Sequence, residues 1–309
     1  SFEVFYHRRQ EEEVRSLADY LLREHFPELI PAEKPYVALL SEIVYRTAEL
    51  VAQWQAVGFC HGVMNTDNFS ALGLTIDYGP FGFLDAFDSH HICNHSDDGG
   101  RYAWDRQPMI GHWNITKLLQ ACLPLLADEP KAAVERAQPI ADSYPDAYGK
   151  TMLGLWAAKL GLRDVRDGDE VLINRWLNLL QASRADFTRS WRHLARVKAD
   201  DDGLAHGLRD EILDLAALDA WIPDYRARLQ SEASDDAERM VRMNAVNPKY
   251  VLRNHLAQRA IERAEKGDAS EITRLFELLR KPFDEQPENE AYAAEPPPEA
   301  RMIEVSCSS

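Results

Sequence analysis

The stretch HGVMNTDNFSALGLTIDYGPFGFLDAFD, residues 61–88, differs in character from the sequence on either side of it. It is rich in Gly, Asn and Asp and shows little helical periodicity. Leu72, Leu74 and Ile76 alternate along the chain, which predicts a brief strand between two loops. Irregular loops of this length are uncommon in compact domains and are usually functional. The two loops that flank the predicted strand are therefore the first candidates for a site.

Three side chains in these loops form a candidate metal site. Asp67 and Asn68 lie in the first loop, and Asp77 follows the predicted strand. Carboxylate and amide oxygens suit a hard cation such as Mg²⁺, and a strand between them lets the two loops converge on one ion. A carboxylate that remains free would serve as a base, which completes the minimum set for phosphoryl or nucleotidyl transfer. The alternative is that these residues only form turns.

The apolar pattern outside this stretch predicts a mainly α-helical protein. Pro35 opens one long helix, which ends at Gly58. An earlier helix has its apolar face at residues 14, 17, 18, 21 and 22. Further helices are predicted over residues 108–127, 131–143, 145–161, 168–196, 206–231, 234–244, 247–267 and 268–280. Four aromatic residues at helical spacings are expected in the core: Trp176, Phe187, Trp191 and Phe276.

Composition excludes several classes of protein. The 35 Lys and Arg residues against 51 Asp and Glu give a net charge of −16, which argues against binding to nucleic acid or to an anionic membrane. No apolar run approaches the roughly 20 residues that span a bilayer, and the first residues do not resemble a signal peptide. Four cysteines fit a reducing compartment, so we expect a cytoplasmic protein. Residues 284–300 are acidic and rich in proline, which predicts a flexible linker.

Residues 61–88 closely resemble the signature of the selenoprotein O (SelO) family of protein adenylyltransferases, which have a protein-kinase-like fold. The resemblance implies a kinase-like C-lobe over residues 1–162, a helical extension over 163–283 and a flexible acidic tail over 284–309. It extends to four further blocks in order: ICNHSDDGGRYAWDRQP (92–108), ADFTRSWRHL (185–194), NPKYVLRNHLAQRAIERAEKGD (247–268) and VSCSS (305–309). In the third block we expect Arg253 and Asn254 to brace the helical extension against the lobe, and the alternative is that they contact the substrate.

The resemblance also implies a role for each residue of the candidate site. Asp67 stands where the family has its proposed catalytic base. Asn68 and Asp77 stand where it has its metal ligands, and Asp77 also belongs to the nucleotide-binding site through that metal. The family moves AMP from ATP to Ser, Thr or Tyr hydroxyls of proteins with Mg²⁺ or Mn²⁺, and transfer of UMP is a variant. ATP and proteins with hydroxyl side chains are therefore the expected partners.

No N-lobe of a kinase-like enzyme is found in the sequence. No Gly-rich loop precedes Asp67, and Lys34 lies between two prolines rather than in a strand. We therefore expect a C-terminal fragment that lacks the nucleotide-clamping N-lobe and binds ATP weakly unless that lobe is supplied. Two alternatives remain open. One is a phosphotransferase of the kinase type, which would release ADP rather than pyrophosphate, and the other is an inactive fragment that only binds partners.

Two cysteines suggest redox chemistry. Cys93 lies where a kinase has its activation segment, and Cys307 lies where some members of the family carry selenocysteine. We hypothesise that a reversible Cys93–Cys307 disulfide pins the tail across the active-site loop, and the alternative is two unrelated free thiols. The histidines near Cys93, at positions 90, 91 and 95, match no known zinc-finger spacing.

Overall fold

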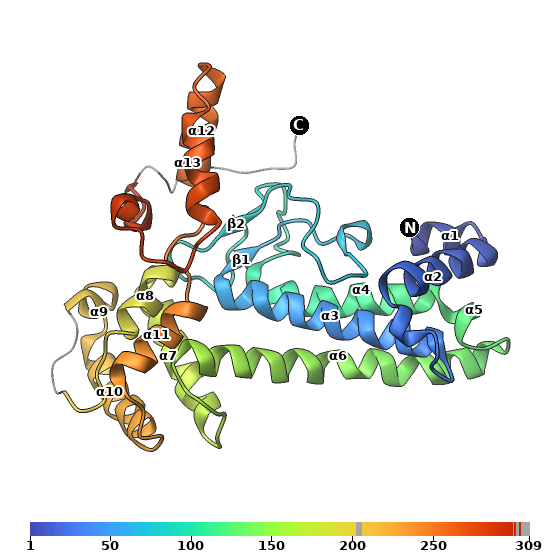
Figure 1. The fold of residues 1–309 in the computed structure, drawn as a ribbon, viewed down its shortest axis with the longest axis horizontal. Helices are drawn as coiled ribbons and strands as arrows, with labels where there is room; N and C mark the ends of the chain where they lie inside the picture. Colours follow the sequence, from blue (N-terminus) through green and yellow to red (C-terminus); the bar gives the residue numbers. More distant parts are fainter. Residues whose placement is uncertain (202–205, 299, 301–302, 304–309) are drawn as a thin grey trace. The chain divides into compact units, whose positions relative to one another are not determined.

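The computed structural model describes residues 1–201, 206–298, 300 and 303, and it is mainly α-helical, as predicted. The chain divides into two compact units, which Figure 1 shows in sequence colours. Unit 1 comprises Ser1–Trp54, Val63–Gly79 and Asp105–Met152, and unit 2 comprises Gln55–Gly62, Pro80–Trp104 and Leu153–Ser309. The domain boundaries expected at residues 162 and 283 stay predictions. None of the described helices is both long and apolar enough to cross a bilayer.

Unit 1 is built from helices that share one hydrophobic core. The first predicted helix and the helix that opens at Pro35 are confirmed. Residues of five helices meet in the core, among them Leu21, Ile43, Leu119, Leu125 and Ile140. The predicted helix over 108–127 is present as two helices, because the chain turns at Cys122. The helices that begin in unit 1 are α1 (Phe2–His7), α2 (Glu11–His25), α3 (Pro35–Val57), α4 (Gln107–Ala121), α5 (Leu123–Leu126) and α6 (Pro130–Lys159).

Helix α6 continues where the sequence predicts a break. Proline normally ends a helix because it lacks an N–H group and its ring clashes with the preceding turn. α6 nevertheless runs through Pro139 and Pro145. The carbonyl of Ala141, which Pro145 leaves without its helical donor, accepts a hydrogen bond from Nε2 of His112 in α4 at 3.1 Å. The prediction of two separate helices is therefore wrong, and a contact from a neighbouring helix supplies one reason.

α4 and α6 approach closely at a glycine. A Cβ atom added to Gly111 of α4 would lie 2.2 Å from the hydroxyl oxygen of Tyr144 in α6. The Tyr144 ring also stacks on His112, with ring centroids 5.2 Å apart. The Tyr144 hydroxyl is buried and has no hydrogen-bond partner among the described residues. Position 111 therefore needs glycine because the tyrosine fills the space of a side chain.

Unit 2 contains a core of stacked aromatic side chains. Trp176 and Trp191 are buried, and the rings of Trp221 and Tyr225 stack with centroids 4.8 Å apart. Core packing is confirmed for Trp176, Phe187 and Trp191. It is wrong for the fourth expected position, Phe276, which is 61% exposed because the helix α13 (Ser270–Leu279) turns its Leu275 and Leu278 face inward instead.

The predicted helices of this unit are shorter than the apolar pattern suggests. The predicted helix over 168–196 breaks at Arg184, which has φ of +46°, and a new helix starts after Asp186 caps it. Asn247 does not begin a helix; its side chain donates to the Lys159 carbonyl at 3.1 Å, and the next helix starts at Asn254. The helices are α7 (Asp169–Ser183), α8 (Phe187–Leu194), α9 (His206–Glu211), α10 (Leu215–Gln230), α11 (Asp236–Val246), α12 (Asn254–Glu265) and α13 (Ser270–Leu279).

A buried arginine joins three segments of unit 2. Arg253 is 1% exposed and forms an ion pair of 2.9 Å with Asp186, the residue that caps α8. Its other guanidinium nitrogen pairs with Asp85. Asp85 follows the short antiparallel sheet of β1 (Phe59–Cys60) and β2 (Gly82–Phe83). The expected bracing role of Arg253 is confirmed, because it ties the start of α12 to the sheet segment and to α8.

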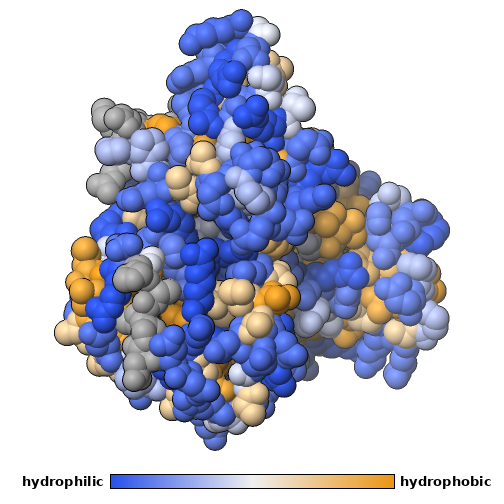
Figure 2. All heavy atoms as spheres, turned by 60° about the vertical axis from the view of Figure 1, so that its left-hand side comes forward, coloured by the Kyte–Doolittle hydropathy of each residue, from blue (hydrophilic) through white to orange (hydrophobic). Residues whose placement is uncertain are grey.

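Part of the segment expected to be flexible packs against the α12–α13 hairpin. Residues 287–293 form a short 3-10 helix, η4. Tyr292 is buried in a cluster with Leu256 and Leu278, and its hydroxyl donates to Glu271 at 2.9 Å. This aromatic anchor within an acidic, proline-rich segment accounts for the difference. The visible face in Figure 2 is otherwise mostly hydrophilic, as the charged composition leads us to expect.

Candidate functional site

Residues 63–79 form an irregular loop of unit 1 whose backbone is held by buried amide side chains. Asn68 is 8% exposed, and its Nδ2 donates to the carbonyl of Val63 at 2.9 Å. Asn114 of α4 donates to the carbonyl of Met64 at 3.0 Å. These bonds satisfy carbonyls that no regular secondary structure pairs. Asn114 is a structural residue of the site that the sequence analysis did not identify.

A single antiparallel bridge joins the two halves of the loop. Phe69 pairs with Thr75, and Trp54 of α3 donates from Nε1 to the Thr75 hydroxyl at 2.8 Å. The strand predicted from the alternation at residues 72–76 is reduced to this one bridge. Asp67 lies two residues before Phe69 and Asp77 lies two residues after Thr75, so the bridge joins the two segments that carry these carboxylates.

The two carboxylates face solvent. Asp67 is exposed within the 3-10 turn η2 (Thr66–Asn68), and Asp77 is also exposed. Asp77 has φ of +57°, in the left-handed region, and its carbonyl accepts a hydrogen bond from the Gly79 N–H at 2.8 Å. Few residues other than glycine adopt this conformation, although Asp and Asn tolerate it best. The turn at Asp77 is thus specific in shape as well as in charge.

The donor atoms of this loop fit a hard divalent cation. Asp67 and Asp77 offer carboxylate oxygens, and Asn68 uses its amide nitrogen on Val63, which leaves its Oδ1 as the atom able to bind a cation. Within the described ranges no cluster of three or more His, Cys, Asp or Glu residues could hold a metal ion, and this loop offers only two carboxylates besides the amide. The histidines near Cys93 form no such cluster either.

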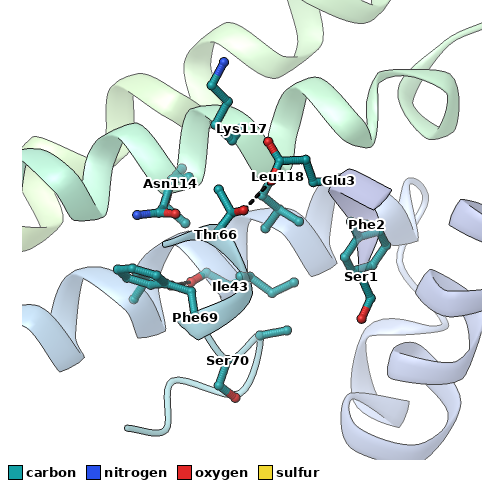
Figure 3. A pocket seen from close by; sticks show the side chains of 13 residues that line it. Ser1, Phe2, Glu3, Ile43, Thr66, Phe69, Ser70, Asn114, Lys117 and Leu118 are labelled. Carbon is teal, nitrogen blue, oxygen red and sulfur yellow. Dashed lines mark hydrogen bonds between the residues drawn. The ribbon is translucent and has the colours of Figure 1, made fainter. Parts of the chain in front are cut away.

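A small pocket opens beside the turn η2 and is separate from these carboxylates. Its volume is about 90 Å³, and Figure 3 shows it between α1, α3 and α4. The Thr66 hydroxyl donates to the carboxylate of Glu3, and the Lys117 ammonium points away from this pair. Asp67, Asn68 and Asp77 do not line this pocket. A nucleotide would need several times this volume, so the pocket is not a nucleotide site.

The structure describes only one of the two cysteines of the redox hypothesis. Cys93 is 7% exposed in unit 2, and its Sγ lies 3.5 Å from the carbonyl oxygen of Cys60. Cys307 lies outside the described residues. The Cys93–Cys307 disulfide therefore stays a hypothesis. The other two cysteines, Cys60 and Cys122, are completely buried.

The fold and the loop define a mainly helical protein with a solvent-facing pair of carboxylates and an amide suited to a divalent cation. The chain belongs to the SelO family. A sequence model of this family, described as protein adenylyltransferase SelO, matches residues 1–280.

Curated relatives are similar to the chain over its whole length. A protein nucleotidyltransferase YdiU of Methylococcus capsulatus (strain ATCC 33009 / NCIMB 11132 / Bath) is 57% identical over 309 residues. Proteins of the same name are 54% identical in Burkholderia pseudomallei (strain 1710b) and 52% identical in Paraburkholderia xenovorans (strain LB400). In each case the match covers 100% of this chain and 61% of the relative. The chain therefore spans about three-fifths of the length of these relatives.

Proposed function

We propose that this chain carries the catalytic loop of a protein adenylyltransferase, which transfers AMP from ATP to Ser, Thr or Tyr hydroxyls of proteins. The observation that carries the proposal is the loop of residues 63–79, in which Asp67 and Asp77 are exposed on the two segments that one bridge joins, and the buried Asn68 is held by its bond to Val63. The names of the family and of the relatives support nucleotidyl transfer. We further propose a protein-kinase-like architecture for the segment that holds this loop.

Each residue of the loop has a role in this reaction. Asp67 accepts the proton of the acceptor hydroxyl, and its exposure leaves room for a protein substrate. The hydroxyl oxygen forms a bond to the α-phosphorus of ATP, the bond from that phosphorus to the bridging oxygen breaks, and pyrophosphate leaves. Asn68 and Asp77 would hold Mg²⁺ or Mn²⁺, which offsets the charge on the phosphates when bound. UMP transfer from UTP would follow the same steps.

Metal binding tests the site in the chain itself. We expect Mn²⁺, followed by the electron paramagnetic resonance signal of the free ion, to bind at least tenfold more weakly to Asp77→Asn than to the original chain. The matched control is Asp128→Asn, which removes an exposed aspartate elsewhere in unit 1. Equal Mn²⁺ binding by the original chain and Asp77→Asn would show that Asp77 is not a ligand.

Product analysis tests the reaction. With α-labelled ATP, the active protein should label an acceptor protein with AMP and release pyrophosphate, and Asp67→Asn should lower the rate by about 100-fold or more, as expected for loss of a general base. Release of ADP with γ-phosphate transfer would instead identify a kinase-type phosphotransferase. Labelling that persists at the original rate in Asp67→Asn would contradict the role of Asp67.

A further inference from the structure

A basic pocket in unit 2 is not used by the proposed reaction. Its volume is about 280 Å³, and it is lined by residues of α8, by Lys249 and by the acidic segment around η4. Four of its side chains follow the spacing i, i+3, i+4 and i+7 and therefore lie on one side of α8 and of the turn after it. They are Arg189, Arg192, His193 and Arg196.

One inner cation of this pocket, Arg192, is held in place by the backbone. Its side chain is 10% exposed. Its Nη1 donates to the carbonyls of Asn244, Asn247 and Phe283 at 3.2, 3.1 and 3.3 Å. The Arg192 charge is therefore fixed before any ligand binds, which lowers the entropic cost of binding. The Lys249 side chain is also 10% exposed, and it is held by Glu285 and Glu290 instead.

Three of the anions that face these cations are much more exposed, whereas a fourth, Glu211, is 9% exposed and pairs with Arg189 at 3.1 Å. Glu285 also pairs with Arg192. The Glu285, Glu290 and Glu295 side chains are 58%, 66% and 75% exposed. Lys249 Nζ lies 2.6 Å from Glu285 and 2.5 Å from Glu290, whereas Glu295 is 3.8 Å from Arg189. Exposed carboxylates gain little from such pairs because water solvates them almost as well. An anion that carries more charge than one carboxylate can therefore replace them.

One group of the pocket has spare binding capacity. Arg196 is exposed and has no ion pair with the acidic residues in the part of the chain that the structure describes. Nδ1 of His193 also lacks a hydrogen-bond partner there, but it is buried against Gly207 of α9 and does not open to the pocket. Burial, together with the positive charges of Arg196 and Arg189, lowers the pKa of His193 to about 4. The ring is therefore neutral at pH 7 and adds no charge to the pocket, so the cations available to an anion are the three arginines and Lys249.

We propose that this pocket binds a small phosphate-bearing anion of the pyrophosphate class, with Glu285 and Glu290 as tethered competitors that release Lys249 when the anion enters. Forked guanidinium groups match the geometry of phosphate oxygens and bind them in pairs. The volume is below the range of about 300–1,000 Å³ that holds drug-sized ligands, so a compact anion fits best. Binding here needs no divalent cation and does not rest on the proposed nucleotidyl transfer.

Calorimetric titration of pyrophosphate into the protein in the presence of EDTA tests whether the cationic side chains of the pocket bind this anion. Chelation removes the metal that the loop of Asp77 would require, so the two sites are distinguished. We expect binding that weakens at least tenfold in Arg196→Gln. Lys198→Gln, which removes an exposed cation that does not line the pocket, should bind as the original chain does. Separate titrations with orthophosphate and ATP show how the affinity depends on the number of phosphates. A titration with sulfate shows whether the pocket binds anions in general.

Variants of the glutamates distinguish competition with the bound anion from a purely structural role of the ion pairs. Glu290→Gln should bind pyrophosphate several-fold more tightly, because Lys249 loses a competitor. Glu288→Gln removes the same charge from the same 3-10 helix outside the pocket and should change the affinity little. Circular dichroism confirms that each variant is folded. Absence of binding in both the original chain and Glu290→Gln, equal affinity for sulfate, or weaker binding in Glu290→Gln would overturn the proposal.

Discussion

Asp77 combines an exposed carboxylate with a backbone conformation that few side chains adopt. Left-handed conformations at residues other than glycine cost free energy and often occur at functional positions. Asparagine tolerates this conformation nearly as well as aspartate, whereas alanine does not. Asp77→Asn therefore removes the charge and keeps the turn, so a loss of metal binding in this variant reports on the carboxylate alone.

The sequence alone suggests a role for some residues in and around the loop and gives no sign of the role of others. The sequence points to Asp67, Asn68 and Asp77 because their residue types suit a metal and their order resembles a family signature, and their roles stay predictions. Asn114 could not be predicted, because an asparagine on an apolar helix gives no sign of the distant carbonyl that it binds, here that of Met64. Its role depends on the tertiary contact between α4 and the loop.

At Arg253 we predict a large loss of stability. Arg253→Ala leaves the buried Asp186 without its counter-ion, and breaking a buried ion pair in this way costs about 3–5 kcal/mol. Urea unfolding followed by tryptophan fluorescence measures the change in the free energy of unfolding. Arg280→Ala, whose pair with Glu277 is exposed, should cost less than about 1 kcal/mol. Similar losses in the two variants would mean that the Arg253 pair contributes no more than a surface pair.

Among the helices, α6 is a case in which a rule based on the local sequence gives the wrong prediction. The rule that proline ends a helix considers only the chain itself. In α6 the carbonyl freed by Pro145 is satisfied from another helix, by His112. The opposite error occurs in the predicted helix over 168–196, where the apolar pattern continues through a turn at Arg184. Patterns therefore locate helices well, and tertiary contacts decide where they end.

The pairing of His112 with Pro145 predicts coupled mutational effects. In Pro145→Ala the new N–H can bond to the Ala141 carbonyl, so His112→Phe should cost less in that background than in the original chain. We expect a coupling of about 0.5–1 kcal/mol in a double-mutant cycle of urea unfolding. Pro139→Ala is the matched control, because the carbonyl four residues before it belongs to Glu135 and does not contact His112. Additive effects of His112 and Pro145 would contradict the compensation.

Over the whole molecule, the sequence predicts the helical class but not the division into two units. Residues 55–62 and 80–104 belong with the C-terminal half of the chain. Their association depends on pairing between Phe59 and Phe83 and on the ion pairs of Arg253, which connect residues far apart in the sequence. Contacts of this kind leave no periodic pattern, and so the unit boundaries could not be read from the chain.

The burial of the cysteines predicts low thiol reactivity of the native protein. Burial raises the pKa of Cys122 to about 12, and it also raises that of Cys60, so neither forms the reactive thiolate near pH 8. In Cys307→Ser, which keeps the three cysteines that the structure describes, we expect no thiol to react rapidly with Ellman's reagent and all three to react after unfolding in urea. A rapid phase in this variant would show that a buried thiol becomes accessible in the native state.

The contact between Gly111 and Tyr144 also limits how this protein can change over evolutionary time. A methyl group at position 111 is tolerated only where the oxygen opposite it has gone, since the two would occupy the same space. Phenylalanine at position 144 would lose no hydrogen bond with the described residues, because the hydroxyl makes none there. Lineages should thus acquire phenylalanine first and a larger residue at position 111 afterwards, and the reverse order of substitution should be selected against.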